Sequence, residues 1–208
     1  MSISIRYNCA VTDRLDLRRR LNELAFGQAG YFTASQAKAV GYTYQAQKYH
    51  VDRGNWSRID RALFRLPGWP SAAEDVYARW WVWSEGLGVI SHESAAAVHD
   101  FGDLDPGQVH LILPGSRTSN PGVILHRDTL EANDIEQRPS FQVTTAVRTL
   151  LDLAAANITQ EQLTTAVHDA TRSGLVSRTA LRQRMDRFGA VAALRLERAL
   201  ATTASVTP

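Results

Sequence analysis

The sequence is short of cysteine, of lysine and of long apolar runs. Its only cysteine, Cys9, allows no disulfide within the chain, which is typical of a protein kept in a reducing compartment. No stretch reaches the ~18 consecutive apolar residues that a membrane-spanning helix needs. The first residues also lack the apolar run of a signal peptide. We therefore expect a cytoplasmic protein that does not associate with a membrane.

Acidic residues are scarce in the first third of the chain, although the formal net charge of the 208 residues is only +2. Residues 1–70 hold 11 Lys and Arg against 5 Asp and Glu, a net charge of +6. Residues 71–208 hold 12 against 16, a net charge of −4. A basic segment suits a polyanion such as nucleic acid, and the acidic remainder indicates a different partner.

Two short helices joined by a tight turn are predicted in the basic part. Thr33 can cap a helix over Ala34–Val40, because its hydroxyl can accept a hydrogen bond from a free N–H of the first turn. Gly41 then ends this helix in a left-handed conformation, which glycine adopts at little steric cost. Thr43 can cap a second helix over residues 44–53. Two helices joined by a short turn that contains glycine are typical of a helix-turn-helix.

A short hairpin follows these helices. Residues 56–59 and 63–66 read as two strands around a three-residue turn, and Pro67 ends the second strand. A helix-turn-helix followed by such a hairpin is a winged helix. A helix over residues 13–26 is expected to support it, and residues 1–12 read as an arm or a short strand.

The Pro-Gly-Trp-Pro sequence at residues 67–70 predicts a boundary between two domains. The first domain, residues 13–68, is the predicted winged helix-turn-helix. The second, residues 71–202, is predicted to be a mixed α/β domain that ends in helices, and residues 203–208 a flexible tail. The fold class is therefore predicted to be α+β. Within the second domain, strands are expected at 109–113, 122–127 and 141–144, and helices at 71–85, 92–99, 145–156, 159–172, 178–187 and 190–201.

The second helix of the helix-turn-helix is expected to present one face to DNA. Residues three and four apart share a helix face, which leaves Ala46, His50 and Val51 on the side that should pack inward. The side chains expected to face the DNA are Thr43, Tyr44, Gln45, Lys48 and Tyr49. The side chains expected to hold phosphates, from the helix end and the hairpin, are Arg53, Arg58, Arg61 and Arg65.

Three further motifs have structural explanations. Arg148 and Asp152 stand four apart and can form an ion pair on one helix. His92 and His99 stand seven apart, too far to share one ion unaided, and no H-E-x-x-H occurs, so no metal site is predicted. The adjacent residues 91–93 (Ser-His-Glu) cannot converge on one point as a hydrolase triad must.

Two short matches to protein-kinase motifs leave a second hypothesis open. Residues 126–128 (His-Arg-Asp) followed by Asn133 match H-R-D-x-x-x-x-N in spacing, and residues 100–102 match D-F-G. In a kinase, Asp128 would position the substrate hydroxyl, while Asn133 and Asp100 would hold Mg²⁺ with ATP. The order of the two motifs is reversed, however, no G-x-G-x-x-G occurs, and this part of the chain has no lysine. Coincidence is the better interpretation of the match.

Four stretches of the chain, taken in order, resemble the AbiEi family of antitoxins from bacterial toxin–antitoxin and abortive-infection systems. They are FTASQAKAVGYTYQAQKYHVDRGNWSRIDRALFRLP (32–67), VISHESAAAVHDFG (89–102), VHLILP (109–114) and VTTAVRTLLDLA (143–154). The resemblance implies an N-terminal winged helix that binds inverted repeats in its own promoter and represses the operon. It also implies a C-terminal domain that neutralises a toxin of the nucleotidyltransferase fold. One departure is that the recognition helix, commonly Arg-rich in the family, here holds Lys48 as its only cation before Arg53.

These observations lead to three functional hypotheses. The leading one is an antitoxin that binds promoter DNA, represses its own operon and contacts a nucleotidyltransferase-like toxin, with no cofactor and no catalytic residue. The alternative from another class is a phosphotransferase that uses ATP and Mg²⁺ to modify the toxin, with Asp100, Asp128 and Asn133 as its site. A third hypothesis is a winged-helix transcriptional regulator without a toxin partner.

Overall fold

The computed structural model describes residues 3–115 and 120–204, and the chain divides into two compact units. The first unit comprises Met1–Gly86 with Pro139–Phe141, and the second comprises Leu87–Arg138 with Gln142–Pro208. Each contains helices and a β-sheet, so the predicted α+β class is confirmed. Within the described ranges, no helix is long and apolar enough to cross a membrane.

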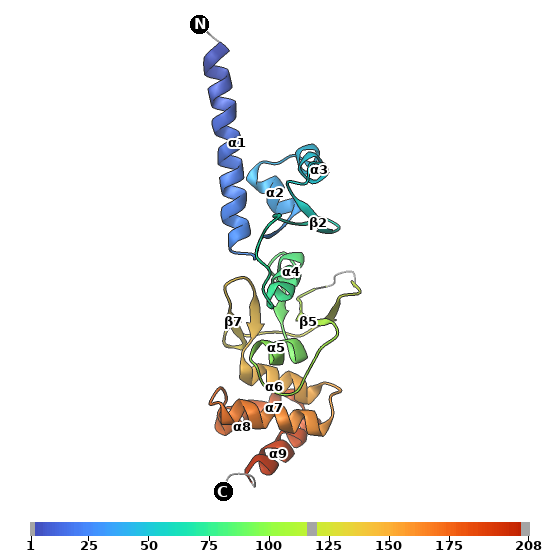
Figure 1. Cartoon of the computed structure of the whole chain (residues 1–208). Coiled ribbons are helices and arrows are strands. Elements are labelled where there is room, and N and C mark those ends of the chain that lie inside the picture. The colour runs from blue at the N-terminus through green and yellow to red at the C-terminus, as the bar shows by residue number, and fades with distance from the viewer. Residues whose placement is uncertain (1–2, 116–119, 205–208) are drawn as a thin grey trace. The chain divides into compact units, whose positions relative to one another are not determined.

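The first unit places its helices around a three-stranded antiparallel sheet (Figure 1). The sheet has the order β1-β3-β2. The helices predicted over residues 34–40 and 44–53 are present as α2 and α3, the second ending at Asp52, and the predicted hairpin is formed by β2 and β3. The elements are α1 (Ile3–Phe26), β1 (Tyr31–Thr33), α2 (Ala34–Val40), α3 (Tyr44–Asp52), β2 (Ser57–Asp60), β3 (Leu63–Arg65) and α4 (Asp75–Trp83).

Local chemistry explains where α2 and α3 begin and end. Thr33 accepts a hydrogen bond from the Gln36 N–H at 3.1 Å, and the Gln36 side chain accepts one from the Thr33 N–H, which together form a capping box. Gly41 ends α2 with a φ of 124°, a conformation that favours glycine. Thr43 then caps α3 by accepting a hydrogen bond from the Ala46 N–H at 3.2 Å. The turn between the helices is therefore short and fixed at both ends.

An aromatic core joins these elements. Phe32 of β1 is fully buried and packs edge-on against Trp56, with ring centroids 4.9 Å apart. Phe64 of β3 lies 5.8 Å from Phe32, and Leu21 of α1 and Tyr42 of the turn complete the cluster. Burial of each such side chain contributes ~1.5–3 kcal/mol. Tertiary packing of this kind, more than helix propensity, holds two helices as short as α2 and α3 in place.

Helix α1 is longer than predicted. It begins at Ile3, so the arm or short strand expected at residues 1–12 is wrong for residues 3–12, while residues 1–2 lie outside the described residues. The segment from Ile3 to Phe26 contains neither glycine nor proline. Because these are the strongest interruptions of a helix, nothing in the sequence stops α1 from propagating through this segment.

Helix α4 belongs to the first unit, so the boundary predicted at residues 67–70 lies inside that unit. Arg65 at the end of β3 forms an ion pair with Asp75 in the first turn of α4. The Asp75 carboxylate also accepts a hydrogen bond from the Ala72 N–H at 3.2 Å. These contacts attach α4 to the end of β3 in the three-stranded sheet, and the N-terminal segment of the unit ends at Gly86.

The second unit combines a five-stranded sheet of order β6-β5-β4-β8-β7 with a group of helices, of which α6, α7 and α9 pack against one another (Figure 1). Its strands are β4 (Val89–Ile90), β5 (Val109–Ile112), β6 (Val123–His126), β7 (Ile135–Gln137) and β8 (Gln142–Thr144). Its α-helices are α5 (His92–Val98), α6 (Ala146–Ala155), α7 (Gln160–Arg172), α8 (Arg178–Arg184) and α9 (Ala190–Ala204). Short 3₁₀ helices occupy Ala132–Asp134 and Met185–Phe188.

The sheet is mixed and contains two strands that were not predicted. Val89–Ile90, which is too short to be expected alone, lies between β5 and β8, antiparallel to the first and parallel to the second. Ile135–Gln137 falls in a segment expected to be a loop and pairs antiparallel with β8. The helix α9 continues to Ala204, so the predicted tail does not begin at residue 203, and residues 205–208 lie outside the described residues.

Candidate nucleic-acid interface

One face of α3 consists of exposed polar and aromatic side chains. Tyr44 is 63% exposed and Tyr49 is 55% exposed, although both are large rings that a core would normally bury. Thr43, Gln45 and Lys48 are exposed beside them. Lys48 Nζ lies 2.6 Å from the Asp52 carboxylate, one turn along the helix, and this carboxylate offsets part of the lysine charge. The face therefore combines hydrogen-bonding groups and aromatic rings with little net positive charge.

The opposite face of α3 packs into the unit, as predicted for Ala46, His50 and Val51. Ala46 and Val51 are half-buried against the aromatic core, and His50 stacks on Trp56 with ring centroids 4.8 Å apart. Gln47, which was not singled out from the sequence, is buried. Its amide donates hydrogen bonds to the carbonyls at the start of α2 and in the turn, and thereby fixes α3 against α2.

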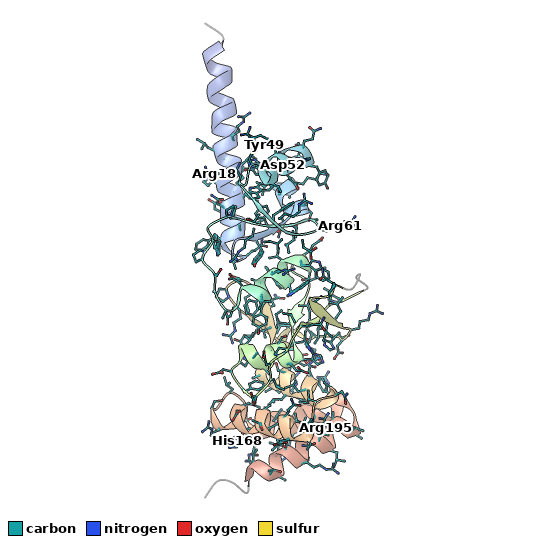
Figure 2. The ribbon with its side chains drawn as sticks, turned by 45° about the vertical axis from the view of Figure 1, so that its right-hand side comes forward. Arg18, Tyr49, Asp52, Arg61, His168 and Arg195 are labelled. Carbon is teal, nitrogen blue, oxygen red and sulfur yellow. The ribbon has the colours of Figure 1, made fainter. Side chains whose placement is uncertain are left out.

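Exposed arginines also occur on the hairpin and at the end of α3. Arg58 and Arg61 are exposed, and Arg61 points away from the hairpin at the β2–β3 turn (Figure 2). The guanidinium of Arg58 lies 5.7 Å from the ring centre of Phe64. Arg53 follows α3 and lies 5.5 Å from the ring centre of Tyr49. Contacts of this kind orient a guanidinium while leaving its N–H groups available to an anion.

Arg65 does not belong to this surface, contrary to the prediction from its place in the hairpin. Its Nε donates to the Ala29 carbonyl at 3.2 Å, its Nη2 donates to the Pro70 carbonyl at 3.2 Å, and it pairs with Asp75. The guanidinium also lies 4.7 Å from the ring centre of Tyr31. These contacts occupy the guanidinium N–H groups that would otherwise bind a phosphate. Arg65 is therefore a structural residue that attaches α4 to the sheet.

Two arginines of α1 extend the cationic surface. Arg14 and Arg18 are exposed, and both line an open groove of about 1050 Å³ whose wall also contains Thr43 and Tyr49 of α3. Figure 2 shows Arg18 on α1 and Tyr49 on α3. The run of arginines at residues 18–20 is visible in the sequence, but its orientation depends on the angle between α1 and α3. The structure therefore adds Arg14 and Arg18 to the candidate phosphate contacts.

In the second unit, Arg148 is the centre of a buried ionic network. Only 3% of its side chain is exposed, and its Nε lies 2.8 Å from the Asp152 carboxylate, which confirms the predicted ion pair. Its other nitrogens pair with Asp134 at 3.3 Å and with Asp128. Burial raises the pKa of Asp152 to about 7, although Arg148 opposes this shift. The network ties the loop after β6 to α6.

The residues of the kinase-like matches have structural roles of their own. Asp128 is paired with Arg148, which neutralises the carboxylate that a kinase would use to position a hydroxyl. Asp100 follows α5 in a left-handed turn, and the next residue, Phe101, is buried in the helical core. Asn133 lies in the 3₁₀ helix before β7. Each match is thus explained by a turn, a core residue or an ion pair.

Three histidines from three elements come together in the second unit, although no metal site was predicted. His92 at the start of α5, His110 of β5 and His126 of β6 each offer a ring nitrogen within 4.8 Å of the others. Burial, with a smaller contribution from the neighbouring rings, lowers the pKa of His92 to about 3 and that of His126 to about 4. No spacing pattern in the sequence indicates this cluster, because only the pairing of β4, β5 and β6 assembles it.

Comparison with protein-family models and with curated proteins found no match. Among solved structures, the chain is similar to the RV2827C protein from Mycobacterium tuberculosis, with 16% sequence identity and a TM-score of 0.60. The similarity covers 89% of this chain and 76% of that chain. At this level of identity, the likeness shows a common fold and nothing about function.

Proposed function

We propose that this protein is a DNA-binding antitoxin that represses its own operon. The observation that carries the proposal is the exposed face of α3, with Tyr44, Gln45 and Tyr49, in a unit that also exposes arginines on the β2–β3 hairpin. These side chains are not part of the hydrophobic core and do not attach α4 to the sheet. A surface of this composition, on the basic part of the chain, suits a nucleic acid.

The elements divide the work of binding between specificity and affinity. An α-helix fits the major groove of DNA, and there a glutamine such as Gln45 can form two hydrogen bonds with adenine. Arg58 and Arg61 on the hairpin, with Arg14 and Arg18 on α1, would contact phosphates and set the register of α3. Because α3 itself holds one lysine, paired with Asp52, most of the electrostatic affinity would come from the arginines outside it.

The antitoxin part of the proposal rests on the resemblance to the AbiEi family. Three of its four stretches, at 89–102, 109–114 and 143–154, form α5, β5 and α6 with their neighbouring strands in the second unit. This part of the chain is acidic, which suits a protein partner better than DNA. The expected partner is a toxin of the nucleotidyltransferase fold, bound through the second unit.

The two functions can be separated by one pair of substitutions in the hairpin. We expect Arg58→Ala with Arg61→Ala to weaken binding of the full chain to its promoter DNA, measured by fluorescence anisotropy over a range of salt concentrations. The slope of log affinity against log salt should become shallower by about 0.9 for each lost phosphate contact. Neutralisation of the toxin, measured as growth on co-expression, should be unchanged.

The matched control removes two exposed arginines from the second unit instead, with Arg172→Ala and Arg198→Ala. This variant has the same net charge as the hairpin variant and should bind the promoter as the unmodified chain does. Equal salt slopes for the two variants would contradict the proposed role of the hairpin. Loss of toxin neutralisation in the hairpin variant would contradict the division of functions between the units.

A further inference from the structure

We propose that His92, His110 and His126 form a binding site for a divalent transition metal, with Zn²⁺ as its best-suited ion. The site lies in the second unit and is independent of the proposed DNA interface. Imidazole nitrogen is a preferred ligand of Zn²⁺, and three protein ligands with one open position are a common arrangement around it. No other group in the described part of the chain has the geometry for a metal ion.

The distances within the cluster suit a single ion. His126 Nε2 and His110 Nδ1 are 3.1 Å apart. Two nitrogens bound to one tetrahedral zinc, each at about 2.0–2.1 Å, are separated by about 3.3 Å, so this pair already has nearly the required spacing. The third nitrogen, from His92, lies within 4.8 Å of the others. A modest turn of the His92 ring, out of its stack on His126, would bring it into the same coordination shell.

The fold places two of the ligands on one face of the sheet. β5 and β6 are parallel, with His110 opposite Ile124 and Ile112 opposite His126. Because side chains alternate between faces along a strand, His110 and His126 point to the same face. β4 delivers the third ligand, since it pairs with β5 and leads directly into His92 at the start of α5.

A neighbouring hydroxyl is positioned to orient His92. The buried Ser91 Oγ lies 3.0 Å from His92 Nδ1. If Nδ1–H donates to this oxygen, the lone pair of Nε2 is available to a metal, as is usual for histidine ligands held by a second hydrogen bond. All three rings are partly exposed, which gives an ion access from solvent. The lowered pKa values also keep the rings in the neutral form that a metal binds.

The arginine charge that acts on His92 does not oppose an ion strongly. Arg148 is the cation that acts on His92, and its guanidinium is paired with Asp128, Asp134 and Asp152. The rival explanation of the cluster is a metal-free group of imidazoles, in which His110 and His126 share one N–H···N hydrogen bond. The two explanations differ in whether added metal binds at these three residues.

The test is titration of the full chain, purified with a chelator and dialysed, with Zn²⁺ in a calorimeter and with Co²⁺ in a spectrophotometer. We expect one ion per chain, the visible absorption of a tetrahedral nitrogen-ligated Co²⁺ complex, and a rise in Tm with Zn²⁺. His110→Asn and His126→Asn should each weaken Zn²⁺ binding by at least about tenfold and remove the Tm rise.

Two controls make the outcome specific to the cluster. His168→Asn changes a partly exposed histidine on α7 (Figure 2) and should leave Zn²⁺ binding unchanged. All variants are made in a Cys9→Ser background, so that the single thiol cannot contribute a ligand. Absence of Zn²⁺ binding by the unmodified chain would overturn the proposal and requires no variant to fold. Unchanged Zn²⁺ binding by the His110→Asn, His126→Asn double variant would overturn it as well.

Discussion

At the scale of single residues, Arg148 shows how one buried charge can organise a unit. It pairs with three aspartates, one on its own helix and two on the segment between β6 and β7. A buried ion pair stabilises little by itself, because desolvation offsets the Coulomb attraction, but removing one partner leaves an uncompensated charge. Arg148 is therefore better understood as an anchor for the loop after β6 than as a source of net stability.

Asp152 adds a pH dependence to this anchor. Burial raises the pKa of Asp152 to about 7 in the folded protein, against about 3.9 in an unfolded chain. The folded state therefore binds this proton more tightly, so the contribution of Asp152 to stability is fully present below pH ~4 and is lost as the pH rises through ~7. The surrounding charges that act on it are Arg148, Asp128 and Asp134.

We expect Asp152→Asn to remove this contribution. The free energy of unfolding, measured by urea titration at several pH values between 4 and 8, should fall less steeply with rising pH in the variant than in the unmodified chain. Both proteins contain the same histidines, so the contribution of the histidines to the pH dependence of stability cancels in the comparison. An identical pH profile for the two proteins would show that Asp152 has an ordinary pKa in the folded state.

At the scale of elements, the helices of this protein were more predictable than its strands. Threonines at 33, 43, 145 and 159 were expected to begin helices, and each caps one in the structure. A helix cap depends on the residue types at about four neighbouring positions, so it can be recognised in a single sequence. Short strands such as Val89–Ile90 form because distant segments pair with them. No local sequence pattern indicates that pairing, so such strands cannot be predicted from their own residues.

The candidate sites follow the same rule. The exposed face of α3 was predictable, because helical periodicity separates it from Ala46 and Val51 within a few residues. The structural role of Arg65 was not, because its partners at Ala29, Pro70 and Asp75 lie in other segments. The histidine cluster was missed for the same reason, since its members are separated by 18 and 16 positions and meet only in the folded sheet.

The turn between α2 and α3 gives a test at this scale. In Gly41→Ala, the new Cβ would lie 2.7 Å from Leu17 Cδ2 at a φ of 124°, so backbone strain and a clash with α1 act together. In the control Gly54→Ala, φ is 71° and no heavy atom lies within 4 Å. We expect Gly54→Ala to cost about 1 kcal/mol and Gly41→Ala about 1–3 kcal/mol more, measured by urea unfolding. Equal costs would contradict the close packing of this turn on α1.

At the scale of the whole molecule, the two parts of the chain have opposite charge and different proposed partners. Residues 1–70, with a net charge of +6, contain α3, the hairpin and the exposed arginines of α1. Residues 71–208, with a net charge of −4, contain the buried Arg148 network and the histidine cluster. This difference in charge supports the proposal that the first unit binds DNA and the second a protein partner, whereas the proposed metal site rests on the geometry of its three histidines.

The central claim is that α3 reads a DNA sequence, and it is tested most directly by comparing two DNA duplexes. The full chain is titrated into a labelled duplex from its own promoter and into a scrambled duplex of the same length and composition, at one fixed salt concentration, with fluorescence anisotropy as the readout. We predict binding to the promoter that is tighter by at least about 10³-fold, as for other specific DNA-binding proteins. Equal affinity for the two duplexes, or no binding to either, would contradict the account.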